Sequence, residues 1–314
     1  MTAAVLDRVR PPSTASVIAA RLGHAAQALG IGDPAPALAT LLGETFARPG
    51  DDPVYRGNHL LPGALPLEWS FAEDNPDALR FEMQPCDPSM RPAERLAHAI
   101  AAIRALAAAD QGEAAAARLA DMAGAVGSPR DFGAFLGFAF HARRRTEYKI
   151  YLEAGQGEPA LLPGTTPHFH SLSLGPNGLA QRHYHLCSDG LRLLDLEPLC
   201  DRLGLSHHFP SLIVMLLDLT DGAFHLPPRS ALLGVRGGEL KVELVVGSAA
   251  EQAGLSTRIA ASLSPGAGVS FRRWAALVAP AGRIDPLLRV VSIRVRADAP
   301  LSISVYAAEA DGPP

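Results

Sequence analysis

Short segments in which apolar and polar residues alternate recur along the chain, and they come in adjacent pairs. Residues 65–72 and 78–84 alternate on either side of a polar turn, a pattern typical of a β-hairpin. By the same criteria the chain contains four further strand pairs: 132–141 with 146–153, 168–174 with 180–186, 212–219 with 239–246, and 287–296 with 301–307. The sequence therefore predicts five antiparallel hairpins.

Helical segments precede and separate these hairpins. Near the start of the chain the dipeptide Ser13-Thr14 can cap one helix, and Pro36 opens a second. Pro92 begins an alanine-rich helix that a second helical stretch follows, and residues 193–203 and 248–278 also have helical character. The units repeat in architecture, although the sequence identity between them is low.

Strands joined by short turns must be antiparallel, because parallel neighbours need long crossover connections. Ten such strands can close into a barrel, which removes exposed sheet edges and leaves room for a ligand. We therefore expect an α+β fold: a ten-stranded antiparallel β-barrel of five hairpins surrounded by α-helices. The whole chain, 1–314, is expected to form one domain, with helices in 1–60 packing on barrel repeats in 61–310.

The composition suits a folded protein with a large core, since 48% of the residues are apolar and 19% are charged. A net charge of −4 gives no global attraction for nucleic acid or an anionic membrane, so neither is an expected partner. With no signal-like or membrane-spanning apolar segment, a cytoplasmic location is expected. Three cysteines without CxxC spacing argue against a disulfide framework or a cysteine-ligated structural zinc.

If helices cover the apolar strand faces, the polar faces point into the barrel. Each hairpin then contributes one cation to the interior, and we call these five residues the strand cations: Arg80, Lys149, Arg182, Lys241 and Arg294. Alternating charge on one strand is more typical of a solvated sheet face, but five strands agree here. Unpaired buried cations cost several kcal/mol each, so the pattern predicts a bound polyanion such as a diphosphate.

The chain is poor in aromatic residues, with 5 Tyr, 2 Trp and 11 Phe. Three of the tyrosines, Tyr151, Tyr184 and Tyr306, fall on the predicted interior face and are called the lumen tyrosines below. A phenol can donate a hydrogen bond to a phosphate oxygen and present its π-face to a carbocation. Carboxylates share this face, among them Glu68, Glu82, Glu147, Glu153, Glu239 and Glu243.

Several short motifs, in order over residues 60–308, resemble those of the ABBA aromatic prenyltransferases, which include the dimethylallyltryptophan synthases. They are Pro66-Leu67-Glu68-Trp69-Ser70, Leu79-Arg80-Phe81, Lys149-Ile150-Tyr151, a turn containing Gly178 that leads to Arg182-x-Tyr184, and Val305-Tyr306. Members of that family build one antiparallel barrel from αββα repeats. The sequence departs from the family at Arg182-His183-Tyr184, where Arg-x-Lys-x-Tyr is common, and at Lys241-x-Glu243.

The resemblance implies transfer of a dimethylallyl or longer prenyl group from its diphosphate to an aromatic or nitrogen nucleophile of an amino acid, peptide or related small molecule. It implies that the strand cations bind the diphosphate, that the lumen tyrosines shield the allyl cation, and that Glu68 accepts the proton. No DDxxD-type metal motif is present, so no obligatory cofactor is expected, although Mg²⁺ on Glu82, Glu153 or Glu243 is an option. The excess of interior carboxylates favours a cationic acceptor.

Two other functions compete with this interpretation. The motifs His168-x-His170 and His183-x-His185 could bind a transition metal, as in barrel-shaped oxygenases. However, a turn at residues 175–178 places His183 and His185 on the strand face opposite Arg182, so only one set can line the lumen. A non-catalytic barrel that binds a phosphorylated ligand is the other alternative. The segment Gly234-x-x-Gly237-Gly238 is interpreted as a turn, because no helix follows it.

Overall fold

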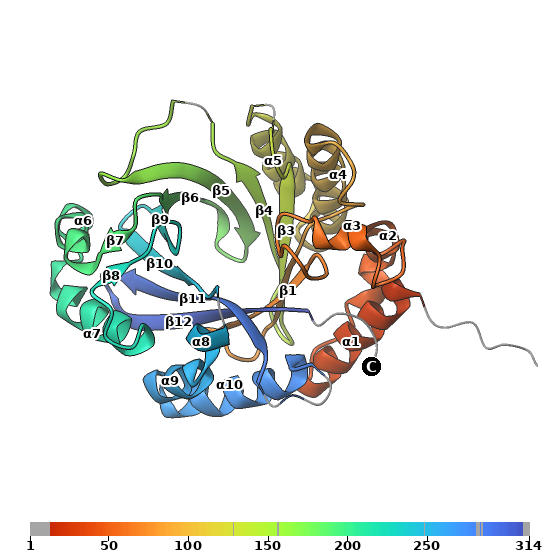
Figure 1. Cartoon of the computed structure of the whole chain (residues 1–314). Coiled ribbons are helices and arrows are strands. Elements are labelled where there is room, and N and C mark those ends of the chain that lie inside the picture. Colours follow the sequence, from red (N-terminus) through yellow and green to blue (C-terminus); the bar gives the residue numbers. More distant parts are fainter. Residues whose placement is uncertain are drawn as a thin grey trace, which may run out of the picture.

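Ten strands form a closed antiparallel barrel in the order β1-β12-β11-β10-β9-β6-β5-β4-β3-β2 (Figure 1). The computed structural model describes residues 13–309 except 128, 156, 248, 281, 282 and 284. The barrel strands are β1 (Leu67–Ala72), β2 (Leu79–Met83), β3 (Ala134–Phe140), β4 (Glu147–Glu153), β5 (Thr165–Gly175), β6 (Gly178–Cys187), β9 (Ala231–Arg236), β10 (Glu239–Val245), β11 (Leu287–Arg296) and β12 (Ala299–Ala308). The predicted fold class is confirmed.

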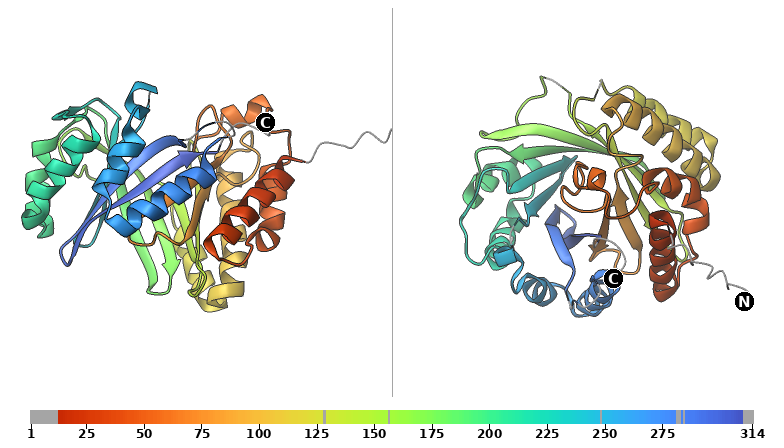
Figure 2. Two further views of the ribbon diagram at one scale, coloured as in Figure 1. Left: turned by 90° about the horizontal axis from the view of Figure 1, so that it is seen from below. Right: turned by 45° about the vertical axis from the view of Figure 1, so that its right-hand side comes forward.

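Helices surround the barrel on its outside (Figure 2). They are α1 (Thr14–Leu29), α2 (Ala35–Thr45), α3 (Pro53–Arg56), α4 (Pro92–Gln111), α5 (Glu113–Gly124), α6 (Glu197–Leu203), α7 (Phe209–Leu219), α8 (Ala249–Gln252), α9 (Leu255–Ser262) and α10 (Pro265–Val278), with short 3-10 turns at Leu193–Leu196 and Ser206–His208. A separate two-stranded sheet pairs β7 (Leu191–Arg192) with β8 (His225–Leu226). Within the described ranges, no helix has the length and apolarity needed to cross a membrane.

The apolar strand faces point outward and pack against these helices. On β1, Leu67, Trp69 and Phe71 are almost fully buried, and the Phe71 ring lies 5.5 Å from that of Phe271 in α10. The α-helix α4 places its small and branched residues against β3 and β4, where Ile103 is fully buried. Burying one such side chain contributes about 1.5–3 kcal/mol, so helix packing fixes which strand face is left for the lumen.

The fourth hairpin differs from its prediction. Residues 212–219 are not a strand but belong to the helix α7, which begins at Phe209 with Pro210 in its first turn and buries Leu212, Leu216 and Leu219. The buried leucines are spaced by four and three residues, which is the period of a helix. In an apolar segment without clear alternation, this spacing indicates a helix rather than a strand. The hairpin partner of β10 is β9. Its sequence is almost continuously apolar, so it showed no alternation from which a strand could be predicted. Gly237 and Gly238 form the tight turn between the two strands.

All five hairpin turns lie at the same end of the barrel. Neighbouring strands are antiparallel around the closed sheet, so β1, β3, β5, β9 and β11 run in one direction and each ends at its hairpin turn. We call this end of the barrel the turn end and the opposite end the mouth. The distance of a residue from its turn therefore orders the residues of one strand between the turn end and the mouth.

Candidate functional site

A cavity of about 750 Å³ opens at the mouth of the barrel. Its walls include Glu68, Glu82, Glu243, Tyr151 and Tyr306, which come from β1, β2, β10, β4 and β12. Residues from segments that precede or follow the strands, such as 130–132, 154, 155, 157 and 158, complete the rim. The volume suits a small-molecule site, and polar side chains from opposite walls converge on it.

Two strands place a cation on the turn side of a cavity carboxylate. On β2 Arg80 lies nearer the turn than Glu82, and on β10 Lys241 lies nearer the turn than Glu243. Carboxylates also lie at the turn end, because Glu147 and Glu239 are the first residues of β4 and β10. At the cavity lie the three residues that we call the mouth carboxylates: Glu68, Glu82 and Glu243.

The electrostatics of Lys149 show that the strand cations converge. Burial lowers the pKa of Lys149 to about 7, against the opposing charge of Glu82, and the positive charges of Arg80, Lys241 and Arg182 act in the same direction as burial. Its Nζ donates a hydrogen bond to the Tyr151 hydroxyl at 3.2 Å. Because burial and the neighbouring cations hold its pKa near neutral pH, the Lys149 amine gains positive charge when an anion binds beside it.

Three of the strand cations have carboxylate partners, so the expectation of five unpaired cations is wrong. Lys241 Nζ lies 2.5 Å from Glu243, Arg294 Nη1 lies 2.7 Å from Asp74, and Arg182 pairs with Glu239. For Arg80 and Lys149 no ion pair forms within the described residues.

Several buried donors of these cations nevertheless have no acceptor. They are Arg80 Nε, Arg182 Nη1 and Arg294 Nε, each of which is shielded from solvent. Buried N–H groups are almost always hydrogen-bonded in folded proteins. Guanidinium groups bind phosphate oxygens through charge-assisted hydrogen bonds, so the unpartnered donors are suited to an anion in the lumen.

The mouth carboxylates crowd one another. Glu68 lies directly opposite Glu82 in the β1–β2 register, and both are less than 10% exposed. Burial raises the pKa of Glu68 well above its usual value, and the charges of Glu82 and Glu243 raise it further. Glu82 accepts a hydrogen bond from Tyr151, and Glu243 from Lys241. Glu68 makes no such bond within the described residues, which leaves its carboxyl group available to a ligand in the cavity.

Aromatic rings lie beside the strand cations. Lys241 Nζ is 4.9 Å from the ring centre of Tyr306 and 5.9 Å from that of Tyr184. Phe169, which sequence reasoning missed, stacks on Tyr184 at 4.4 Å and meets the edge of Tyr151 at 5.7 Å. Its signal was present, because Phe169 alternates with the polar residues of β5. The aromatic wall is thus wider than the lumen tyrosines alone.

Two inward-facing glycines make room for these rings. Gly234 lies inside β9 rather than in a turn, which corrects its prediction. A Cβ atom at Gly234 would come within 2.8 Å of Cε1 of Tyr184, and one at Gly137 within 3.4 Å of Cε2 of Tyr151. The first contact is closer than real Cβ atoms approach, so the position of the Tyr184 ring requires glycine at 234.

Two of the carboxylates predicted to face the interior, Glu153 and Glu147, have other roles or positions. Glu153 accepts hydrogen bonds from the backbone N–H groups of residues 130–133 at 2.7–2.9 Å, which hold that rim segment. Burial opposes ionisation of Glu153, but these four donors keep its pKa below the usual value. Glu147 lies at the turn end, 3.9 Å from His141, and its side chain is 41% exposed. Both therefore lie outside the group of mouth carboxylates.

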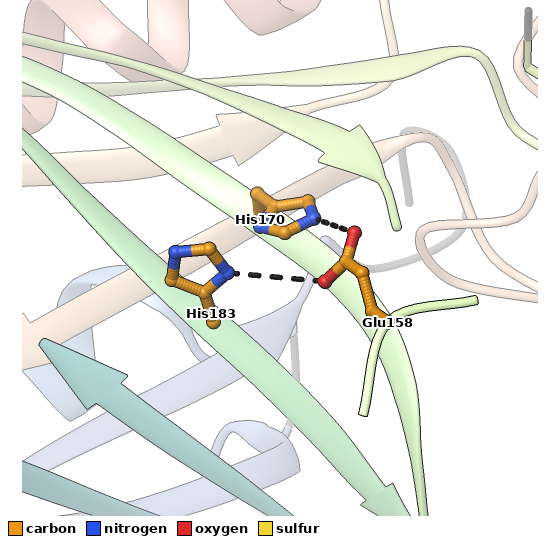
Figure 3. A group of neighbouring side chains, drawn as sticks. All are labelled: Glu158, His170 and His183. Atoms are coloured by element: carbon orange, nitrogen blue, oxygen red, sulfur yellow. Dashed lines mark hydrogen bonds and ion pairs between the residues drawn. The ribbon is translucent and has the colours of Figure 1, made fainter. Parts of the chain in front are cut away.

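The histidine motifs do not form a metal centre in the lumen. Arg182 and Tyr184 point inward, so His183 and His185 occupy the outer face of β6. A bulge between Pro167 and Phe169 sends His168 toward the cavity rim, whereas His170 faces outward. Within the described ranges, one group of at least three His, Cys, Asp or Glu residues is spaced for a metal ion: Glu158, His170 and His183, drawn in Figure 3.

The mouth carboxylates are accordingly not arranged as a three-ligand metal site. Mg²⁺ is commonly held by one or two carboxylates together with substrate phosphates. Glu82 and Glu243 already accept hydrogen bonds from Tyr151 and Lys241, and Glu153 is saturated by backbone donors.

No protein-family model matches the sequence, and no curated protein matches it either. The fold, however, is that of the ABBA prenyltransferases. The prenyltransferase PriB in its binary complex with product diphosphate superimposes with a TM-score of 0.75 at 18% identity, over 96% of this chain and 98% of that one. The 6-dimethylallyltryptophan synthase from Micromonospora olivasterospora, in complex with DMASPP and Trp, gives 0.72 at 18% identity, over 96% and 100%. The 5-dimethylallyltryptophan synthase from Streptomyces coelicolor gives 0.72 at 14%, over 96% and 98%.

Proposed function

We propose that this protein is a prenyltransferase that moves a dimethylallyl or longer prenyl group from its diphosphate to an aromatic or nitrogen nucleophile of an amino acid, peptide or related small molecule. One observation carries the proposal: within the described residues, neighbouring cations with unsatisfied guanidinium donors, the lumen tyrosines and the buried carboxyl group of Glu68, which makes no hydrogen bond, face the same lumen. The solved structures with the same barrel include prenyltransferases in complex with DMASPP and tryptophan, which supports this choice.

In the proposed reaction the strand cations bind the diphosphate toward the turn end. The allylic C–O bond breaks, and its electron pair leaves with the diphosphate, whose charge the preorganised cations stabilise without reorganisation. The lumen tyrosines and Phe169 flank the allyl cation with their π-faces and exclude water. The cations thereby supply the leaving-group stabilisation, and no metal cofactor is required by the proposal, with Mg²⁺ as an optional addition on the diphosphate.

Glu68 is the proposed proton acceptor. Once the acceptor atom bonds to the allyl carbon, its proton passes to the Glu68 carboxylate, which lines the cavity. Three crowded carboxylates favour an acceptor that brings its own positive charge, such as an ammonium or guanidinium group. Burial and the charge of Glu82 raise the pKa of Glu68 in the free protein. A cation bound among the mouth carboxylates would lower this pKa, so Glu68 would be in the ionised form that a base requires.

Mass spectrometry of a substrate panel tests the proposal. Dimethylallyl, geranyl and farnesyl diphosphates are each incubated with free amino acids, short peptides and phenols, and a prenylated product is expected for at least one combination. The Glu68→Gln variant should transfer roughly 10²–10⁴-fold more slowly while binding the donor normally. The exposed Glu197→Gln is the matched control and should keep full activity. Donor binding without turnover on any acceptor would instead establish a non-catalytic binding barrel.

A further inference from the structure

A second group of polar side chains lies outside the lumen, where α5 packs against β5 and β6. His170 and His183 are directly paired in the β5–β6 register, and Glu158 reaches them from the segment between β4 and β5 (Figure 3). His170 Nε2 lies 2.8 Å from one oxygen of Glu158, and His183 Nδ1 lies 3.9 Å from the other. The proposed transfer reaction uses none of these residues.

We propose that Glu158, His170 and His183 bind a zinc ion on the outer face of the barrel. Two imidazole nitrogens and one carboxylate oxygen form a ligand set that zinc uses with a water at the fourth position. Zinc–ligand bonds near 2.1 Å place neighbouring ligand atoms of a tetrahedron about 3.4 Å apart. The distances of 2.8 and 3.9 Å lie on either side of that value, and all three ligand atoms fall within 4.8 Å of one another. Small side-chain rotations therefore complete the site.

The surroundings suit a bound ion. A groove of about 570 Å³ adjoins the cluster and leaves space for the water ligand. His170 is only 6% exposed, and its Nδ1 has no hydrogen-bond partner. His185 lines the same groove two residues after His183, with its own Nδ1 also unpartnered.

The ion would fasten the segment that carries Glu158 to the barrel wall. Gly155, Gly157 and Glu158 contribute to the rim of the mouth cavity, and Glu158 also accepts a hydrogen bond from the Gly155 N–H. Zinc would thus tie one side of the rim to two strands without entering the lumen. Its binding is independent of prenyl transfer, so each proposal can fail while the other stands.

Tag-free protein tests the site. After dialysis against a chelator and then against buffer, Zn²⁺ is titrated in by calorimetry, and the metal content is measured by mass spectrometry. One zinc per chain is expected, together with a rise in Tm and, with Co²⁺ as a probe, the visible absorption of a tetrahedral site. The three cysteines should not compete, because burial raises the pKa of Cys86 to about 12 and those of Cys187 and Cys200 to about 11.

Substitutions assign the ligands. His183→Asn and Glu158→Gln are each expected to lower zinc affinity at least tenfold and to abolish the zinc-dependent rise in Tm. The His183 side chain is 47% exposed, so its replacement leaves the metal-free fold intact. His24→Asn, at an exposed histidine in α1, is the matched control and should bind zinc like the parent. Absence of stoichiometric zinc in the parent protein, or unchanged affinity in both ligand variants, would overturn the proposal.

Discussion

Lys149 should make donor binding sensitive to pH. Its pKa of about 7 means that the free protein loses this positive charge as the pH rises through neutrality. A diphosphate placed among the strand cations favours the charged ammonium, so binding takes up a proton whenever Lys149 starts neutral. We therefore expect the apparent affinity for the donor to fall as the pH rises above about 7.

The size of the effect follows from the fraction of protein with charged Lys149. For a group of this pKa, that fraction decreases roughly 90-fold from pH 6 to pH 9. If only the ammonium form binds the donor, the apparent Kd rises by the same factor. The neighbouring Arg80, Arg182 and Lys241 contribute to the low pKa of Lys149. Burial lowers the pKa of Lys241, but the charges of Glu243, Tyr184 and Tyr306 outweigh it and keep that pKa raised.

Calorimetry with a non-hydrolysable dimethylallyl thiolodiphosphate measures the Kd at each pH, and two variants isolate the contribution of Lys149. In Lys149→Arg the charge is permanent, so affinity should stay near its low-pH value. In Lys149→Met the charge is absent, so affinity should be weak at every pH. Ionisation of the ligand itself contributes equally to all three proteins and is removed by comparing their slopes. Equal slopes of log Kd against pH in the parent and in Lys149→Met would refute the assigned role.

Three further outcomes are expected. Gly234→Ala should displace the Tyr184 ring, slow transfer at least tenfold and cost about 1–3 kcal/mol in urea unfolding, whereas Gly266→Ala, where a Cβ meets nothing within 4 Å, should be neutral or stabilising. Glu153→Gln should cost about 2 kcal/mol at pH 7 by weakening charge-assisted bonds. Because folding lowers the pKa of Glu153 from 4.5, that cost should shrink as the pH falls below this value, which urea titrations at several pH values measure. A chelator should leave the initial rate of prenyl transfer, followed by product formation, within about twofold of its untreated value; a larger loss that added Mg²⁺ restores and added Zn²⁺ does not would assign Mg²⁺ a part in the reaction.

The strands that sequence could predict are those whose two faces differ chemically. On β1 the set Leu67, Trp69 and Phe71 alternates with Glu68 and Ser70, so both the strand and its inward face were identified correctly. Helix packing and lumen polarity act on opposite faces of such a strand and produce period-two alternation.

The prediction failed at β9 because its lumen face is not polar. Gly234 is there to leave space for the Tyr184 ring, so the strand is apolar or small on both faces and lacks alternation. The apolar run in α7 then offered a more obvious partner for β10, although Leu212, Leu216 and Leu219 have helical spacing. The glycine is required by the ring of a residue on another strand. Such a requirement produces no periodic pattern in the sequence of the strand that carries the glycine.

Ion pairing of Arg182 and Arg294 was equally beyond the sequence, since each partner depends on three-dimensional register, whereas Lys241 pairs with Glu243 two positions along the same strand. Asp74 reaches Arg294 from the β1–β2 turn, 220 positions away in the chain. Glu239 on β10 contacts Arg182 on β6 across the intervening strand β9. Local spacing places a cation on the inner face but does not say which carboxylate shares its height. That height depends on the stagger of the closed sheet, which no single hairpin determines.

On two strands, however, the order of charges was already present in the sequence, and the topology turns that order into a direction. Arg80 precedes Glu82 on β2 and Lys241 precedes Glu243 on β10, and closure puts the turns that both strands leave at one end, so each cation lies on the turn side of its carboxylate. In the proposed reaction this order orients the donor, with its diphosphate toward the turns and its allyl group beside the lumen tyrosines. The acceptor would then occupy the mouth cavity beside Glu68.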